Sequence, residues 1–260
     1  MDRQHYIDFF NSYTDKYLEE AESETETIHL TRKKEHSLRV VDYAMDIAKH
    51  LELEEDELDL IFLISLFHDI GRFEQFKKYR TFSDAKSINH AKQSVIVINE
   101  HDLFSEFNED VKESMNKCVL AHNAKDIPDY FTLSEFLYCS ILRDADKLDG
   151  IYAFINIIPK LSKKEQAVFY SSDIEGTEVS EGLYDAIMNQ DKIDLSEIKS
   201  ALDKKVFLMG NISSSFVNRR SFEIINQQNF LEDMLSLIPI TDKVKMIYDF
   251  EQEYVHSMID

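Results

Sequence analysis

The chain has 260 residues, a formal net charge of −21 and 43% hydrophobic side chains. This composition is typical of a globular protein and excludes a wholly disordered or collagen-like chain. Only five glycines and three prolines occur, which are too few turn-forming residues for a β-sandwich or a β-barrel. The composition therefore favours a mostly helical fold.

The apolar residues recur at helical spacing and predict a series of helices in chain order. The first helix is expected over residues 3–20, and a polar connector over 21–29 follows it. Further helices are expected at 33–51 and 56–68. The second of these is apolar on nearly every side and should be the most buried. Gly71 is expected to stop it, because glycine accepts a left-handed backbone.

The segment 72–88 predicts a loop with one short helix, and more helices are expected at 90–101, 109–121, 134–156 and 162–170. Residues 171–193 contain Gly176 and Gly182 and predict an insertion or a hinge. Helical patterns then follow at 195–209, 214–226, 229–237 and 241–258. We predict an N-terminal helix and connector over 1–29, a core over 30–160, and a C-terminal helical extension over 161–260 packed on that core. A separately folding C-terminal domain is the alternative.

The ends of the chain and its charge bear on location and partners. No apolar run reaches the roughly 18 residues that a membrane span needs, and the N-terminus lacks the pattern of a signal peptide. A cytoplasmic protein is therefore expected, with Cys118 and Cys139 as reduced core thiols. The acidic balance argues against duplex nucleic acid and membrane as partners, but it allows a local cationic pocket for a small phosphorylated ligand. An oligomer stays open.

Histidines and aspartates recur within the helices that are predicted to be buried. His68-Asp69 ends the most apolar helix, and the same kind of environment is expected for His36, His90, His122 and Asp146. Buried carboxylates are costly without a partner, and a divalent metal ion can serve several at once. The alternative is that each histidine is a core or capping residue with its own hydrogen bonds. A second His-Asp pair, His101-Asp102, is interpreted as a chance pair on a polar helix end.

The series His36, His68-Asp69, Asp146 resembles the H…HD…D signature of the HD-domain superfamily of metal-dependent phosphohydrolases. The stretch HDIGRFEQFKKYRTFSDAKSINHA looks like the HD-I-G subgroup, and the resemblance covers about residues 30–155. It implies an all-α, HD-domain-like helical bundle with additional C-terminal helices.

The resemblance also implies a metal centre with one or two divalent ions (Mn, Fe, Ni, Co, Zn or Mg). His36, His68, Asp69 and Asp146 would hold the first ion. His90 and His122 would hold the second ion, with Asp69 as the bridge. In one respect the chain departs from the family pattern, because His122-Asn123 stands where some two-metal members have His-His.

The implied reaction is hydrolysis of a phosphomonoester or a phosphodiester, in a nucleotide or another small phosphate ester, by metal-activated water. Asp69, Arg72 and Lys147 are the expected catalytic residues, the last two as cationic clamps for phosphate. Arg80 and Arg143 are weaker clamp candidates.

Two other functions stay open at this point. An HD-type di-iron oxygenase would use a similar set of six ligands, but Arg72 and Lys147 suit a phosphate better. A non-catalytic nucleotide-binding signalling module is the third hypothesis. The presence of every ligand position in this chain argues against it.

Overall fold

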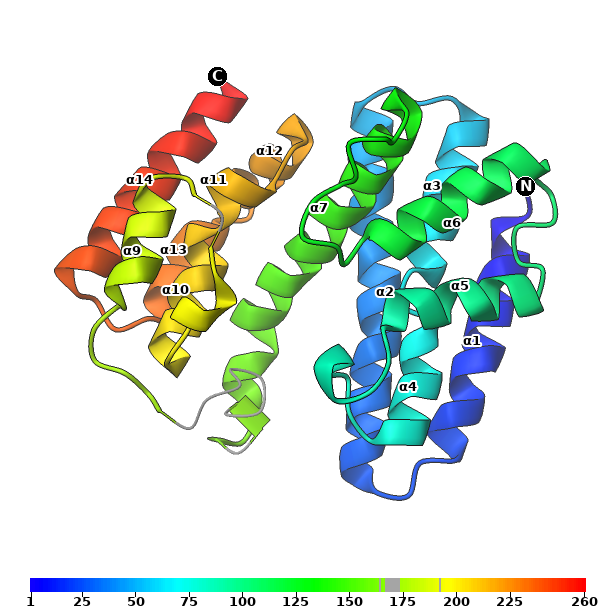
Figure 1. Ribbon diagram of the computed structural model, residues 1–260, viewed down its shortest axis with the longest axis horizontal. Coiled ribbons are helices and arrows are strands. Elements are labelled where there is room, and N and C mark those ends of the chain that lie inside the picture. Colours follow the sequence, from blue (N-terminus) through cyan, green and yellow to red (C-terminus); the bar gives the residue numbers. More distant parts are fainter. Residues whose placement is uncertain (164, 167–173, 192) are drawn as a thin grey trace. The chain divides into compact units, whose positions relative to one another are not determined.

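The computed structural model describes residues 1–163, 165–166, 174–191 and 193–260 (Figure 1). Helices make up its regular structure, and the described residues contain no strand. The fold is therefore all-α, as the sequence predicts. The chain divides into two compact units, Met1–Asp146 and Lys147–Asp260.

The first unit is built around a central helix, α3 (Glu55–Phe67), which contacts α1, α2 and α6. Every residue from Leu58 to Phe67 is buried, which agrees with the prediction of a central helix that is apolar on nearly every side. The other elements of this unit are α1 (Arg3–Glu19), α2 (Glu24–His50), α4 (Gly71–Tyr79), η1 (Asp84–Lys86), α5 (His90–Glu100), α6 (Glu109–Ala121) and the first part of α7 (Leu133–Asn156).

The N-terminal helix α1 is part of this core. Figure 1 shows it antiparallel to α2, and it also contacts α3 and α4. Phe10 is fully buried, and its ring centroid lies 6.3 Å from that of Phe67 and 6.4 Å from that of Phe73. Burial of one such side chain contributes about 1.5–3 kcal/mol, so α1 stabilises the helices on which the site is built.

The helix α2 begins earlier than the sequence pattern predicts. Ser23 is its N-cap, and the Ser23 hydroxyl accepts a hydrogen bond from the Glu26 amide at 3.3 Å. Glu24 and Glu26 lie in the first turn, where carboxylates interact favourably with the helix dipole. The acidic segment that suggested a connector over 21–29 is therefore largely a helix start.

Gly71 does not stop the preceding helix with a left-handed backbone, as the sequence predicted. The helix α3 ends at Phe67, but Gly71 is the first residue of α4 and does not have a left-handed backbone. A Cβ atom at Gly71 would lie only 2.4 Å from the backbone nitrogen of Ser94. Glycine at this position thus permits the close approach of α4 and α5.

The second unit is centred on α14 (Asp242–Ile259), which contacts five other helices of the unit. These are α9 (Glu181–Met188), α10 (Ala201–Gly210), α11 (Ile212–Ser215), α12 (Arg219–Gln227) and α13 (Phe230–Ser236); the end of α7 and the short turns η2 (Ile158–Lys160) and η3 (Leu195–Glu197) complete it. Gly182 lies inside α9, so this part of the predicted insertion is helical. The predicted helix at 162–170 falls mostly outside the described residues.

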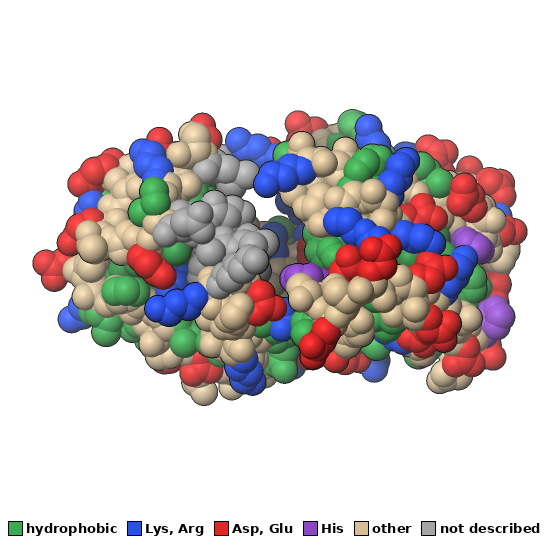
Figure 2. Space-filling view, turned by 90° about the horizontal axis from the view of Figure 1, so that it is seen from below, with side chains coloured by type: hydrophobic (Ala, Val, Ile, Leu, Met, Phe, Trp, Pro, Cys, Tyr) green, Lys and Arg blue, Asp and Glu red, His purple; other side chains and the backbone are tan. Residues whose placement is uncertain are grey.

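The surface of both units is rich in carboxylates. Figure 2 shows Asp and Glu side chains spread over the visible face, with Lys and Arg side chains between them, which fits the net charge of −21. Among the described helices, none has the length and apolarity that crossing a bilayer requires. Cys118 and Cys139 are both buried and form no disulfide, and the cytoplasmic location stays a prediction.

Candidate metal centre

The first unit brings together all six residues that were predicted as metal ligands. They come from three helices and from the residues that directly follow two other helices, and most lie at a helix end. His36 lies within α2, His68 and Asp69 directly follow α3, His90 begins α5, His122 directly follows α6, and Asp146 lies on α7.

Asp69 lies at the centre of this group, and its two carboxylate oxygens face different imidazoles. Asp69 Oδ2 is 3.4 Å from His36 Nε2 and 3.5 Å from His68 Nε2. Asp69 Oδ1 is 3.4 Å from His90 Nε2 and 3.7 Å from His122 Nε2. The carboxylate therefore lies between two pairs of imidazole nitrogens.

Asp146 lies next to His36 and His68. Its Oδ1 is 3.3 Å from His36 Nε2 and 4.0 Å from His68 Nε2. In the triads His36, His68, Asp146 and His68, Asp69, His122, ligand atoms lie within 4.8 Å of one another. His68 belongs to both triads, so the structure does not separate the two predicted ligand sets cleanly.

The hydrogen bonds of His68 and His122 orient both rings in the same way. His68 Nδ1 lies 2.7 Å from the Ser65 carbonyl oxygen, and His122 Nδ1 lies 2.6 Å from the Val119 carbonyl oxygen. A carbonyl only accepts, so each Nδ1 carries the proton and donates it. The Nε2 atom of each ring is left with a lone pair that points into the centre.

The atoms inside the centre have the character of a cation site. His90 Nε2 and His122 Nε2 are only 3.1 Å apart, which places two imidazole nitrogen atoms against each other. His68 Nε2 and Asp69 Oδ1 are buried without a hydrogen-bond partner. Imidazole nitrogens and carboxylate oxygens together suit divalent transition metals, so the donor set fits a bound metal ion. The role of each residue as a ligand stays a prediction.

The electrostatics of the centre favour the ligand forms of these side chains. Burial lowers the pKa of His68, and it lowers the pKa of His90 and of His122 to about 4. Burial alone would raise the pKa of Asp69, but the positive charges of Lys33 and Arg72 and the contacts with His68 and His36 hold that pKa well below its usual range. Neutral imidazole and ionised carboxylate are the forms that bind metal ions.

Two cationic side chains border the centre, and the sequence pattern identified only one of them. Arg72 Nε lies 3.4 Å from Asp69 Oδ1, and Arg72 Nη2 lies 3.3 Å from His90 Nε2. The missed cation is Lys33, whose ammonium is 2.5 Å from Asp69 Oδ2. Lys33 lies three residues before His36 in α2, a spacing that places both on one helix face, but Arg32, four residues before His36, fits the same spacing rule.

The other predicted phosphate clamps are engaged elsewhere. The Lys147 ammonium donates to the Ser215 carbonyl and lies 5.3 Å from the centre of the Phe216 ring, within the second unit. These contacts give no support to a role in binding phosphate, which stays a prediction for Lys147.

The two weaker clamp candidates have structural partners. Arg80 pairs with Glu22, which precedes α2, and with Glu26 in the first turn of α2. Arg143 donates to the carbonyls of Ala121 and Ala124 and so holds the end of α6 beside His122. Arg143 therefore supports the position of a predicted ligand and does not face a substrate through these bonds.

The second His-Asp pair lies apart from the predicted ligands. The His101 ring packs against Phe9 and Tyr13, with centroids 5.2 and 5.6 Å away, and the Asp102 side chain is 73% exposed. These surroundings agree with the interpretation of a chance pair.

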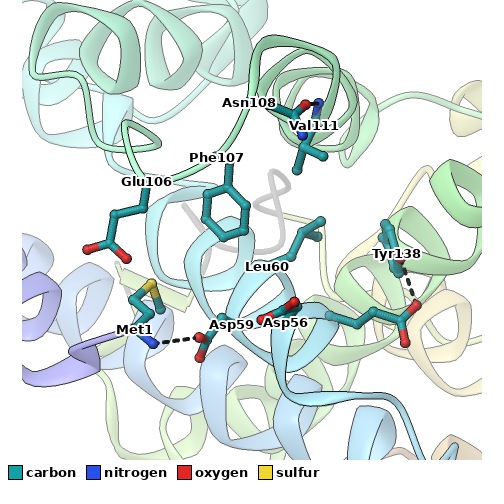
Figure 3. A pocket seen from close by; sticks show the side chains of 10 residues that line it. Met1, Asp56, Asp59, Leu60, Glu106, Phe107, Asn108, Val111 and Tyr138 are labelled. Atoms are coloured by element: carbon teal, nitrogen blue, oxygen red, sulfur yellow. Dashed lines mark hydrogen bonds and ion pairs between the residues drawn. The ribbon is translucent and has the colours of Figure 1, made fainter.

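A separate hollow of about 420 Å³ lies in the first unit, and none of the six predicted ligands lines it (Figure 3). Its wall combines apolar side chains such as Phe107 with carboxylates. Asp59 is paired with the Met1 ammonium at 3.0 Å, and Glu57 accepts from the Tyr138 hydroxyl at 2.8 Å. Because Asp59 and Glu57 already have partners, we assign no cation site to this hollow.

A helical bundle that gathers four histidines and a second aspartate around the buried carboxylate of Asp69 defines a candidate metal-binding helical domain. Residues 34–151 match the family model of the HD domain, and this segment contains all six residues. The match supports membership of the HD-domain superfamily for this segment, and HD domains bind divalent metal ions and are generally metal-dependent phosphohydrolases. Membership of the HD-I-G subgroup stays a prediction. No curated protein and no solved structure matches the chain.

Proposed function

We propose that this protein is a metal-dependent phosphohydrolase that hydrolyses a phosphomonoester or a phosphodiester in a nucleotide or another small phosphate ester. The observation that supports the proposal is that six predicted imidazole and carboxylate ligands, with Asp69 at their centre, lie together with two cationic side chains, Lys33 and Arg72. Divalent ions bound there would supply Lewis acidity and lower the pKa of a bound water toward about 7.

Lys33 supports a phosphorylated substrate. Its ammonium lies against Asp69 Oδ2, the oxygen that faces His36 and His68. Once Asp69 serves as a metal ligand, the Lys33 ammonium can donate to a phosphate oxygen beside the ligands. An ammonium is a strong point-charge partner for phosphate.

Arg72 supports the same conclusion through its orientation. Its Nη1 donates to the Gln75 amide oxygen, the Phe82 carbonyl and Asp84. These bonds hold the guanidinium so that Nε and Nη2 face the centre. The overall charge of −21 disfavours large polyanions, so we propose a small phosphorylated substrate and not duplex nucleic acid or a membrane surface.

The direct test is a substrate panel on the full chain after metal removal and reloading with Mn²⁺, Fe²⁺, Co²⁺, Ni²⁺, Zn²⁺ or Mg²⁺. Release of phosphate or nucleoside is measured from nucleoside monophosphates, cyclic nucleotides, nucleoside triphosphates and small phosphomonoesters. We expect turnover with at least one metal and loss of at least 10³-fold with Asp69→Ala, because catalytic metal chemistry contributes several kcal/mol. The matched control is Asp102→Ala, which changes the aspartate of the other His-Asp pair and should leave turnover unchanged.

Two further arms sharpen this test. Lys33→Met should reduce kcat/KM for the phosphorylated substrate and leave metal content unchanged, because Lys33 contacts a ligand and is not one itself. Metal-loaded protein that hydrolyses nothing in the panel would contradict the proposal. Iron at about two per chain together with oxygen uptake would instead support the di-iron oxygenase.

A further inference from the structure

Asp84 contacts the ring of His90 on the side away from the centre. It lies in η1, six residues before His90, and its Oδ2 and Oδ1 atoms are 2.7 and 2.9 Å from His90 Nδ1. Asp84 Oδ2 also accepts from the His90 backbone amide at 3.3 Å. One carboxylate thus binds both the ring and the backbone of the first residue of α5.

Asp84 is itself held in place by donors from two other parts of the unit. The amide of Gln75, which is fully buried, donates to Asp84 Oδ1 at 2.9 Å, and Arg72 Nη1 donates to the same oxygen at 3.0 Å. The side-chain amide of Asn123 donates to Asp84 Oδ2 at 3.3 Å. Asn123 stands where some two-metal family members have histidine, and here it lies in contact with Asp84.

The hydrogen-bond acceptor beside Nδ1 of His90 is a side-chain carboxylate, whereas the acceptors beside Nδ1 of His68 and His122 are backbone carbonyls. Those two rings donate to a backbone carbonyl three residues earlier, at the end of their own helix. His90 begins its helix, so no preceding helical turn offers it such a carbonyl, and a charged carboxylate takes that place. A carboxylate acceptor on the remote nitrogen fixes the tautomer of a metal-binding histidine and makes it a stronger ligand.

We propose that Asp84 is a positioning residue that holds His90 in the Nδ1–H tautomer with Nε2 directed at the second cation. In this way Asp84 sets the affinity of the second cation without contacting it. The proposal rests on the metal centre of the proposed function, but it does not depend on which reaction the protein performs.

The test uses metal-stripped full chain and Mn²⁺ alone as the probe, with free Mn²⁺ followed by EPR. Asp84→Asn keeps the size of the side chain, but it can present its NH₂ group to the ring and so favour the wrong tautomer. We expect the second Mn²⁺ to bind about 10- to 100-fold more weakly than in the wild type, the usual effect of losing such a partner. The first Mn²⁺ should bind as in the wild type.

A second measurement reads the tautomer directly. In the metal-free wild type, ¹⁵N chemical shifts should place the His90 proton on Nδ1, and in Asp84→Ala the ring should become a mixture of tautomers. The matched control is Asp203→Asn in the second unit, where Asp203 likewise accepts several hydrogen bonds, including one from the Ser180 amide at 2.9 Å. This variant should leave both Mn²⁺ affinities and the His90 shifts unchanged.

Two results would overturn the proposal. One is a wild-type His90 that carries its proton on Nε2, which is measurable even if the variants fold poorly. The other is an Asp84→Asn protein that binds two Mn²⁺ ions with wild-type affinity. Neither readout requires turnover, so a protein that binds two ions and hydrolyses nothing would contradict the phosphohydrolase and leave the Asp84 result intact.

Discussion

The carboxylate of Asp69 is shared by every part of the candidate centre. One oxygen faces His36 and His68, and the other faces His90 and His122. This arrangement is what a bridging ligand between two cations requires, because each oxygen can serve a different ion. Substitution of Asp69 should therefore affect both ions, whereas substitution of His90 should affect mainly the second.

The sequence predicts the ligands better than the residues that orient them. Ligand candidates stand out because histidine and aspartate are unusual in apolar helical segments. Asp84 gives no such signal, since it lies in a polar loop and its distance from His90 follows no helical period. Lys33 is one of three consecutive cations in the stretch Arg32 to Lys34, and only the fold shows which one meets Asp69.

Glu251 allows a prediction of pH dependence outside the metal centre. It is fully buried in α14, and burial raises its pKa to about 7 although the Ser213 amide and hydroxyl donate to it at 2.8 and 2.9 Å. The folded state then holds a proton that the unfolded state releases above pH 4.5. This contribution to the free energy of unfolding is full at low pH and is lost as pH rises through 7.

The expected loss is at most about 3–4 kcal/mol, at about 1.4 kcal/mol per pKa unit for a rise of the pKa from 4.5 to about 7. Urea denaturation between pH 5 and 8 checks it, and the Glu251→Gln variant should lack this part of the pH dependence. Glu253→Gln, at an exposed position of the same helix, should retain it. Identical pH profiles for wild type and Glu251→Gln would refute the assignment.

At the scale of elements, helix ends place most of the site. His68 and His122 follow the last residues of α3 and α6, and His90 is the first residue of α5. Because these helix ends lie close together in the first unit, side chains about 110 positions apart in the sequence can meet. The positions of the helices follow from the spacing of apolar residues. The crossing of α4 and α5 depends on the close backbone contact at Gly71, which that spacing does not predict.

That crossing gives a prediction for Gly71. A Cβ atom there would lie 2.4 Å from Ser94 N and 2.6 Å from the Gln93 carbonyl carbon, so α4 and α5 must move apart in Gly71→Ala. We expect a loss of about 1–3 kcal/mol in the free energy of unfolding, the usual cost of overpacking. Binding of the second Mn²⁺ should also weaken, because His90 begins α5.

Gly150→Ala is the matched control, measured by the same denaturation and Mn²⁺ titration. A Cβ atom at Gly150 meets nothing within 4 Å, and alanine favours a helix over glycine by about 1 kcal/mol. Gly150→Ala should therefore be as stable as the wild type or more so. A Gly71→Ala variant that is no less stable than the wild type would show that α4 and α5 are not tightly packed.

At the scale of the whole molecule, the predicted metal ligands are confined to one of the two units. The HD-domain match ends at residue 151, and all six predicted ligands lie in the first unit. The all-α fold follows from the composition and is confirmed. The packing of 161–260 on the core stays a prediction, because apolar helix faces in the sequence do not specify which unit they meet.

The central claim is that one chain binds two divalent ions at the shared aspartate. Elemental analysis of the full chain, loaded with Mn²⁺ and freed of excess metal, tests it most directly. We predict about two ions per chain for the wild type and for His101→Ala, about one for His90→Ala, and none for Asp69→Ala. A wild-type chain without bound metal, or an Asp69→Ala chain that keeps the wild-type amount, would contradict the account.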